Sequence, residues 1–167
     1  MPYTPTTTVA MGSTWDVHIS IDEKYKDMYS NGLDSLYPAT SGSIGFDLRA
    51  GMDSEFIEVY PGHRVKVHSG IHIQPKQPGI AGFIYSRSGL GATKGLVVAQ
   101  GVAVIDPDYT GELILYLLNN STNPLVIHRG DRVAQLVFQK IELPMLHLVD
   151  SLDDTERGDG GFGSTGI

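Results

Sequence analysis

The sequence predicts one all-β domain, a sandwich or barrel, spanning residues 1–167. Glycine and proline recur about every eight to twelve residues, and the runs between them are short and rich in valine, isoleucine, leucine and tyrosine, which is typical of such folds. A chain of 167 residues favours a single domain that buries roughly 70% of the surface exposed in its unfolded form.

The first expected element is a short helix over "DEKYKDMYSN", residues 22–31. Its residues Tyr25, Met28 and Tyr29 share one face at helical spacing. We expect no other helix outside tight turns. Residues 1–13 are threonine-rich and lack periodicity, so we expect them to be flexible.

Strands are expected from there on. In "HRVKVHSGIHIQ" apolar residues alternate with polar ones, as in a half-buried strand, at Val65, Val67, Ile71 and Ile73. His68 and His72 have the spacing of metal ligands on a helix, but the alternation indicates a strand, so we interpret them as ordinary strand residues. From Leu113 to Leu118 the chain is apolar on both faces, which suits a strand covered by its own core and by another layer or subunit.

The composition narrows the class of function. The chain has no cysteine, which excludes disulfides and a thiol nucleophile. Its net charge of −7 argues against general binding of nucleic acid. No segment approaches the roughly 20 apolar residues of a membrane span, and the first residues lack a signal-peptide pattern. We therefore expect an intracellular protein, cytoplasmic or nuclear, without membrane partners.

One turn carries groups suited to phosphate oxygens. In "YSRSGLGATKG", Arg87, Ser88 and Gly89 offer a guanidinium, a hydroxyl and open backbone N–H groups. A polar, glycine-rich hairpin without a ligand explains this stretch equally well when it is taken alone. The stretch is not a P-loop, because glycine follows Lys94 where that loop needs Ser or Thr.

A second turn places an acid directly after a strand. In "GVAVIDPDYTGEL", Pro107, Asp108 and Gly111 are explained by a β-turn. Asp106 follows the apolar run so closely that we expect its carboxylate at the edge of the core, where partial desolvation raises its basicity.

Two later stretches contain unexplained residues. In "HRGDRVAQLVF" we expect Arg132 to be solvated, whereas Gln135 interrupts an apolar run and needs hydrogen-bond partners. The glycine-rich "RGDGGFGSTG", residues 157–166, fits the spacing of a dinucleotide-binding loop. The acidic residues before it do not form a strand, so that interpretation fails.

Together, "SGSIGFDLRA", "YSRSGLGATKG", "GVAVIDPDYTGEL", "HRGDRVAQLVF" and "RGDGGFGSTG" resemble, in order, the five motifs of the trimeric deoxyuridine triphosphatases (dUTPases). The resemblance implies a jelly-roll-like β-clip barrel or sandwich with a flexible C-terminal arm over residues 151–167. It also implies a homotrimer with shared active sites and Mg²⁺-dependent hydrolysis of dUTP to dUMP and pyrophosphate. That reaction limits uracil incorporation into DNA and supplies dUMP for dTMP synthesis.

The resemblance also implies roles for individual residues. Asp106 would deprotonate the water that attacks the α-phosphorus, and Asp47 would support the metal-water and arginine network. Magnesium would be held mainly by the triphosphate, with no direct protein ligands. The substrate contacts would be Arg87, Ser88, Gly89, Gln100, Val104, Ile105, Tyr109, Gln135, Arg157, Phe162, Gly163, Ser164 and Thr165. Among them, Tyr109 would pack against deoxyribose and Phe162 would stack on uracil. The apolar strand would line a threefold axis through Leu115 or Leu117.

Some residues depart from the family pattern. Ser86, Gln100, Ala103 and Thr110 stand where proline, asparagine, glycine and arginine are common. The related dCTP deaminases are an alternative, but Tyr116 stands where their catalytic glutamate is expected. The other alternative is a jelly-roll domain without catalysis, against which stand Asp106, Arg157 and Phe162.

Overall fold

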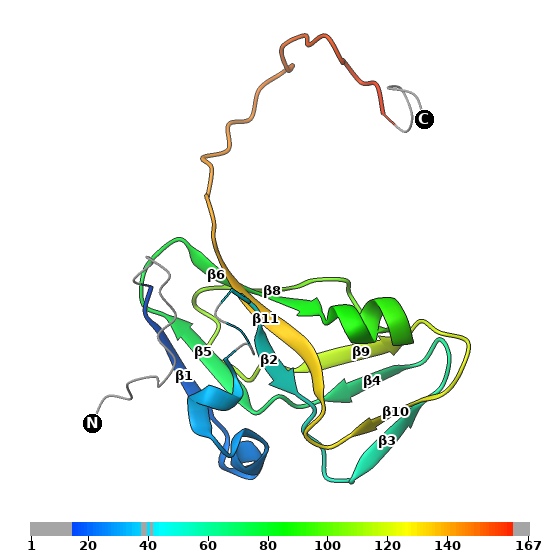
Figure 1. Cartoon of the computed structure of the whole chain (residues 1–167). Coiled ribbons are helices and arrows are strands. Elements are labelled where there is room, and N and C mark those ends of the chain that lie inside the picture. Colours follow the sequence, from blue (N-terminus) through cyan, green and yellow to red (C-terminus); the bar gives the residue numbers. More distant parts are fainter. Residues whose placement is uncertain (1–14, 38–39, 41, 162–167) are drawn as a thin grey trace.

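The computed structural model describes residues 15–37, 40 and 42–161, and it confirms the all-β expectation (Figure 1). The described part of the chain forms the strands β1 (Val17–Ile21), β2 (Phe46–Arg49), β3 (Phe56–Val59), β4 (Arg64–Val67), β5 (Ile71–Pro75), β6 (Ile80–Ser86), β7 (Leu96–Val98), β8 (Ala103–Ile105), β9 (Leu115–Asn119), β10 (Leu125–His128) and β11 (Arg132–Lys140).

The strands pair antiparallel in a jelly-roll-like arrangement. The largest sheet has the order β2–β11–β6–β8, and a second has the order β4–β9–β7. Two further pairs join β1 to β5 and β3 to β10. Most of these neighbours lie far apart in the sequence, as expected when long connections cross between sheets. The long strand β11 lies between β2 and β6, and these three strands carry the phosphate-type motifs.

Within the described residues, three short helical turns accompany the strands. The 3₁₀ helix η1 (Glu23–Tyr29) buries Tyr25, Met28 and Tyr29, which confirms the expected helix and its buried face. A second 3₁₀ turn, η2 (Gly32–Ser35), follows it. The glycine-rich stretch after β6, expected to be a turn, forms the π-helical η3 (Gly89–Lys94). None of the described helices is long and apolar enough to cross a membrane.

The core confirms the alternation expected around residues 63–74. Val67, Ile71 and Ile73 are buried, and Val65 packs against them from a partly buried position. Leu48, Ile84 and Leu136 join the same core from the largest sheet. A strand covered on one face buries every second residue, and this pattern is what the sequence encodes.

The apolar strand β9 corrects one expectation. Leu115 and Leu117 were expected to offer one residue to a subunit axis, but both face the core of their own chain, with 2% and 0% of their surface exposed. The outer face of this strand instead carries Tyr116, which is 48% exposed, and the half-buried Leu118. Any surface that β9 offers to a partner therefore runs through Tyr116 and Leu118.

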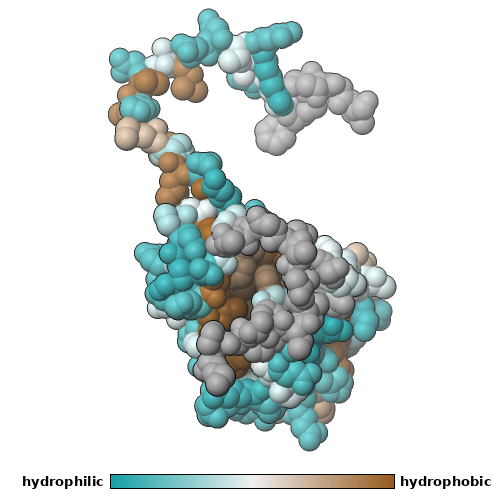
Figure 2. All heavy atoms as spheres, turned by 60° about the vertical axis from the view of Figure 1, so that its left-hand side comes forward, coloured by the Kyte–Doolittle hydropathy of each residue, from teal (hydrophilic) through white to brown (hydrophobic). Residues whose placement is uncertain are grey.

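The C-terminal segment leaves the body directly after β11. The Ile141 N–H donates to the Gly79 carbonyl, and the chain then runs outward as an extended tail (Figure 1). Apolar side chains lie exposed along this tail, as Figure 2 shows in brown: Leu143, Met145, Leu146, Leu148 and Leu152. The arm was expected from residue 151, but the chain separates from the body about ten residues earlier.

Candidate functional site

The phosphate-type turn is anchored where β6 ends. The Ser86 hydroxyl accepts a hydrogen bond from the Val98 N–H at 2.8 Å, which ties the turn to β7. The Arg87 carbonyl accepts the Gly91 N–H at 2.8 Å and so begins η3. Ser88 and Gly89 remain exposed between these two anchors, with their polar groups open to a ligand. The serine that replaces the usual proline thus has a structural role here.

Asp47 on β2 holds two arginines beside this turn. Its Oδ1 lies 2.9 Å from Arg87 Nε, and its Oδ2 lies 3.0 Å from Arg132 Nη1. Arg87 Nη1 also donates to the Arg132 carbonyl at 3.1 Å. Asp47 is only 8% exposed, and a buried carboxylate is tolerated when it is paired in this way. One carboxylate against two guanidiniums leaves a net positive charge that suits phosphate.

Gln135 is the amide that the sequence left without an explanation, and the structure places it in a partly buried position. It lies opposite Asp47 in the β2–β11 pairing, and its Nε2 donates to the Ser86 carbonyl at 3.0 Å. Gly45 passes directly over it: a Cβ at that position would lie 2.2 Å from Gln135 Oε1. The glycine is therefore required for the amide to stand where it does.

These residues surround one cavity of about 440 Å³. Its walls are Gly42, Ser43, Ile44, Gly45, Asp47, Arg87, Ser88, Gly89, Arg132 and Gln135. The structure thus brings together five of the expected site residues. It adds Arg132 and the loop over residues 42–45, which sequence reasoning missed. Arg132 is exposed, as expected, and its guanidinium also pairs with Asp47 at the wall of the cavity.

The expected catalytic acid lies elsewhere. Asp106 follows β8 and is exposed, as are Gln100 and Val104, whereas Ile105 is partly buried. The expectation that the Asp106 carboxylate is desolvated at the edge of the core is therefore wrong within one chain. Asp106 closes a turn in which its carbonyl accepts the Tyr109 N–H at 3.1 Å. Tyr109 is 44% exposed and donates through its hydroxyl to the Glu112 carbonyl at 2.9 Å.

A single chain keeps these two groups of residues apart. Ile105 pairs with Gly82 near the start of β6, whereas Arg87 follows the end of that strand. Five residues of a strand span roughly 17 Å, so Arg87 and Asp106 lie near opposite ends of β6.

The tail holds the remaining expected residues. Arg157 lies in the tail and folds back locally, with its Nε donating to the Gly160 carbonyl at 2.8 Å. Phe162, Gly163, Ser164 and Thr165 lie outside the described residues.

The two histidines with metal-like spacing each lie beside a carboxylate: His68 beside Glu112 and His72 beside Asp22. Among the described residues, no group of three His, Cys, Asp or Glu side chains is arranged to hold a metal ion.

A jelly-roll-like fold with paired arginines, a bracing carboxylate and an open glycine turn defines a protein that binds the phosphates of a small ligand. Comparison of the sequence with known protein families identifies the family within this class of phosphate-binding proteins. Residues 33–166 match the family model described as dUTPase. The chain belongs to the dUTPase family.

Individual relatives agree with this assignment. A deoxyuridine 5′-triphosphate nucleotidohydrolase of Desulfitobacterium hafniense is 44% identical over 129 residues, covering 77% of this chain and 85% of that protein. The structure of a dUTPase from Streptococcus mutans superimposes with a TM-score of 0.62 at 27% identity, covering 76% and 98% of the two chains. A mutant dUTPase of Staphylococcus bacteriophage 80alpha with dUpNHpp has the same fold, with a TM-score of 0.74 at 21% identity, covering 91% and 99%.

Proposed function

We infer that this protein is a dUTP diphosphatase, which hydrolyses dUTP to dUMP and pyrophosphate. The observation that carries this inference is the cavity in which Asp47 holds Arg87 and Arg132 beside an open glycine turn, within the segment that matches the dUTPase family. Guanidiniums held in this way bind phosphate oxygens with charge-assisted hydrogen bonds. The D. hafniense relative carries the corresponding name.

The chemistry is divided between the cavity and the Asp106 hairpin. Arg87, Ser88, Gly89 and Gln135 bind the phosphates, with Asp47 holding the arginine in place. On the hairpin, the backbone over residues 100–106 receives uracil through Gln100, Val104 and Ile105, and Tyr109 packs on deoxyribose. Asp106 accepts a proton from the water that attacks the α-phosphorus, and the leaving group is pyrophosphate.

The active unit is a homotrimer whose sites are shared between chains. The separation of Arg87 and Asp106 by roughly 17 Å along β6 supports this, because the acid that acts on phosphates held by Arg87 can then come from a neighbouring chain. The exposed apolar side chains of the tail support it too, since Leu143, Met145 and Leu146 lie outside the core of their own chain. Arg157, Phe162, Gly163, Ser164 and Thr165 then close over a site formed by neighbouring chains.

The dUTPase family generally uses Mg²⁺, and the residues of the cavity suit a metal that enters on the triphosphate. Both oxygens of Asp47 are occupied by arginines, and the groups around the turn are donors to phosphate. A structure of a mutant dUTPase from phage phi11 of S. aureus describes a coordinated structural Mg(II) ion. When bound, Mg²⁺ neutralises charge on the phosphates, and the chain's donors orient them. We place the enzyme inside the cell, where its substrate is formed.

The test is turnover of dUTP, dCTP and UTP by the wild-type protein with magnesium, followed by assays for pyrophosphate and ammonia. Pyrophosphate from dUTP alone is expected. Ammonia from dCTP would indicate the deaminase, and no turnover of any substrate would contradict the inference.

The trimer is tested by two neighbouring residues on β9. Tyr116→Lys changes the outer face and should separate the subunits while each chain stays folded. Leu117→Lys places a charge in the core of its own chain and should unfold it, because a buried unpaired charge is strongly disfavoured. Sedimentation analysis and circular dichroism distinguish the two results. A folded trimer from Tyr116→Lys would exclude this face as an interface.

A further inference from the structure

The turn that presents Tyr109 is held by Glu112, near the end of the third motif, and by residues of and before β5 that lie outside the five motifs. We propose that Glu112 and His72 are positioning residues that fix this turn, and that this fixation gives the enzyme its preference for 2′-deoxyribonucleotides over ribonucleotides. The proposal rests on the proposed function, because it concerns how the same site reads the sugar of its substrate.

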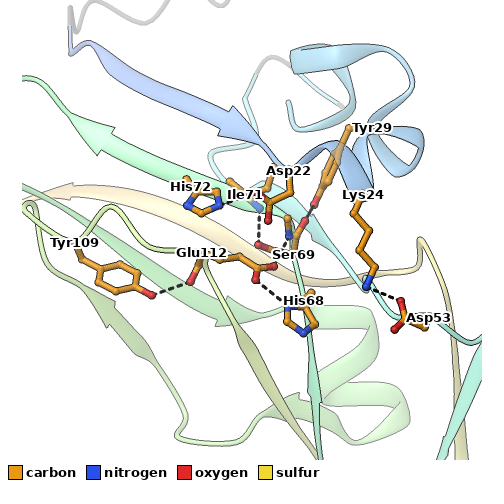
Figure 3. A network of polar contacts seen from close by, with 11 residues as sticks. Asp22, Lys24, Tyr29, Asp53, His68, Ser69, Ile71, His72, Tyr109 and Glu112 are labelled. Atoms are coloured by element: carbon orange, nitrogen blue, oxygen red, sulfur yellow. Dashed lines mark hydrogen bonds and ion pairs between the residues drawn. The ribbon is translucent and has the colours of Figure 1, made fainter.

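Tyr109 is folded back onto its own turn (Figure 3). Its hydroxyl donates to the Glu112 carbonyl at 2.9 Å, so the ring cannot swing outward without breaking this bond. The ring crosses Gly111 so closely that a Cβ there would lie 2.5 Å from the tyrosine oxygen. The backbone of residues 111–112 therefore decides where the ring stands.

The Glu112 side chain anchors that backbone (Figure 3). It is 16% exposed; its Oε1 accepts the Gly70 N–H at 2.8 Å, and its Oε2 lies 2.8 Å from His68 Nδ1. Gly70 packs directly against the buried Tyr25, because a Cβ added at this glycine would lie 2.7 Å from the Tyr25 Cβ. The carboxylate thus joins the turn to a rigid part of the core.

His72 holds the same turn from a second side (Figure 3). Its Nδ1 donates to the Thr110 carbonyl at 3.0 Å, and its Nε2 lies 3.1 Å from Asp22 Oδ1. The Leu113 N–H also donates to the Ile71 carbonyl at 2.8 Å. The turn is consequently bound on both sides of Gly111 to residues that precede or belong to β5.

Fixing the turn matters because steric exclusion works only when the excluding group cannot yield. A ribose differs from deoxyribose by one hydroxyl, and a ring that can move aside accepts it with little penalty. A supporting shell that leaves a site about 1 Å too loose is enough to lose such selectivity. Removing an anchor should therefore improve UTP turnover relative to dUTP turnover.

The experiment compares kcat/KM for dUTP and for UTP in the wild type, His72→Ala and Glu112→Gln. The matched control is Gln74→Ala, two residues further along β5, whose exposed side chain bonds Lys76. We expect the dUTP-to-UTP ratio to fall roughly 5- to 30-fold in His72→Ala, the factor given by the loss of one or two hydrogen bonds. The control should keep the wild-type ratio.

The ratio separates positioning from mere stabilisation. A variant that is only less stable loses active enzyme for both substrates equally, so its ratio stays constant. His72→Ala tests whether the anchors set the dUTP-to-UTP ratio even if Glu112→Gln fails to fold. The His72 side chain is partly exposed, and without it Asp22 remains in contact with solvent, so this variant should fold. A wild-type ratio in folded His72→Ala overturns the proposal. A wild-type protein that does not hydrolyse dUTP instead overturns the proposed function.

Discussion

The phosphate cavity and the Asp106 hairpin are built in opposite ways within one chain. In the cavity, Asp47 holds Arg87 and Arg132, and Gln135 bonds the backbone, so the arrangement exists before any ligand binds. On the hairpin, Asp106 is exposed and Val104 is 61% exposed. The cavity is therefore held by contacts within its own chain, whereas under the proposed function the hairpin is completed by a neighbouring chain.

The largest expected effect comes from the hairpin. Asp106→Asn keeps the size of the side chain and removes the base, so turnover should fall about 10²–10⁴-fold. The melting temperature should stay unchanged, because an exposed carboxylate contributes little to the core. Stopped-assay turnover and thermal melting measure both. Wild-type turnover in this variant would remove Asp106 from the mechanism.

Changes in the C-terminal arm should have the second-largest effect on activity. Phe162→Ala should lower kcat/KM roughly 5- to 150-fold, because base–aromatic stacking is worth about 1–3 kcal/mol. A chain ending at Asp154 should lose more activity while keeping its melting temperature. Mixed trimers of that truncated chain and Asp106→Asn chains should regain activity that neither parent shows. If the truncated chain works as fast as the full one, the arm has no catalytic role.

Asp47→Asn probes the cavity, and its effect should appear in stability as well as in binding. Arg87 and Arg132 would lose their shared carboxylate, so KM for dUTP should rise and the free energy of unfolding should fall by about 1–3 kcal/mol. The smaller end of that range is expected because both arginines are partly solvated. Urea denaturation and steady-state kinetics provide the measurement. Unchanged stability would show that the cavity is not preorganised by Asp47.

The smallest effect concerns the support of the hairpin. The pKa of His72 is raised above its ordinary value by the Thr110 carbonyl and by Asp22, against an opposing effect of desolvation, with Glu112 also facing it. His18 lines the same shallow surface. The protonated form is therefore the stabilising one. Its contribution is complete below about pH 6.5 and is lost as the pH rises through the raised pKa.

Comparing the melting temperatures of wild type and His72→Gln should reveal this contribution. The difference should be larger at about pH 5.5 than at about pH 8.5, and it should correspond to about 1 kcal/mol at most. A difference that grows with pH would mean that the neutral imidazole is the form that holds Thr110.

Much of this could be predicted from the sequence, and the failures have physical causes. Alternation placed Val67, Ile71 and Ile73 correctly, because polar residues mark the outer face of both β4 and β5, the two strands into which the expected stretch divides. Alternation could not orient β9, since its apolar run offers no polar residue to mark the outer face. Only the packing of the chain decides that Leu117 points inward and Tyr116 outward.

The residues of the candidate site likewise include some that the sequence identified and some that it missed. The motif order identified Asp47, Arg87 and Gln135, and the structure places them around one cavity. Arg132 was missed because its pairing with Asp47 depends on the register between β2 and β11, which no local pattern encodes. The exposure of Asp106 was missed because an apolar run before an acid does not tell whether the end of that strand is covered by the core.

The extended tail after Ile141 has a practical consequence for handling the protein. Exposed, extended peptide is what proteases cut most readily, and the exposed polar residues 153–156 offer such peptide directly before Arg157. A single cut there would leave every described strand intact while separating Arg157 from the body. Such a nicked preparation would melt like the intact protein and yet be inactive, so mass spectrometry of the intact chain is the appropriate measure of sample quality.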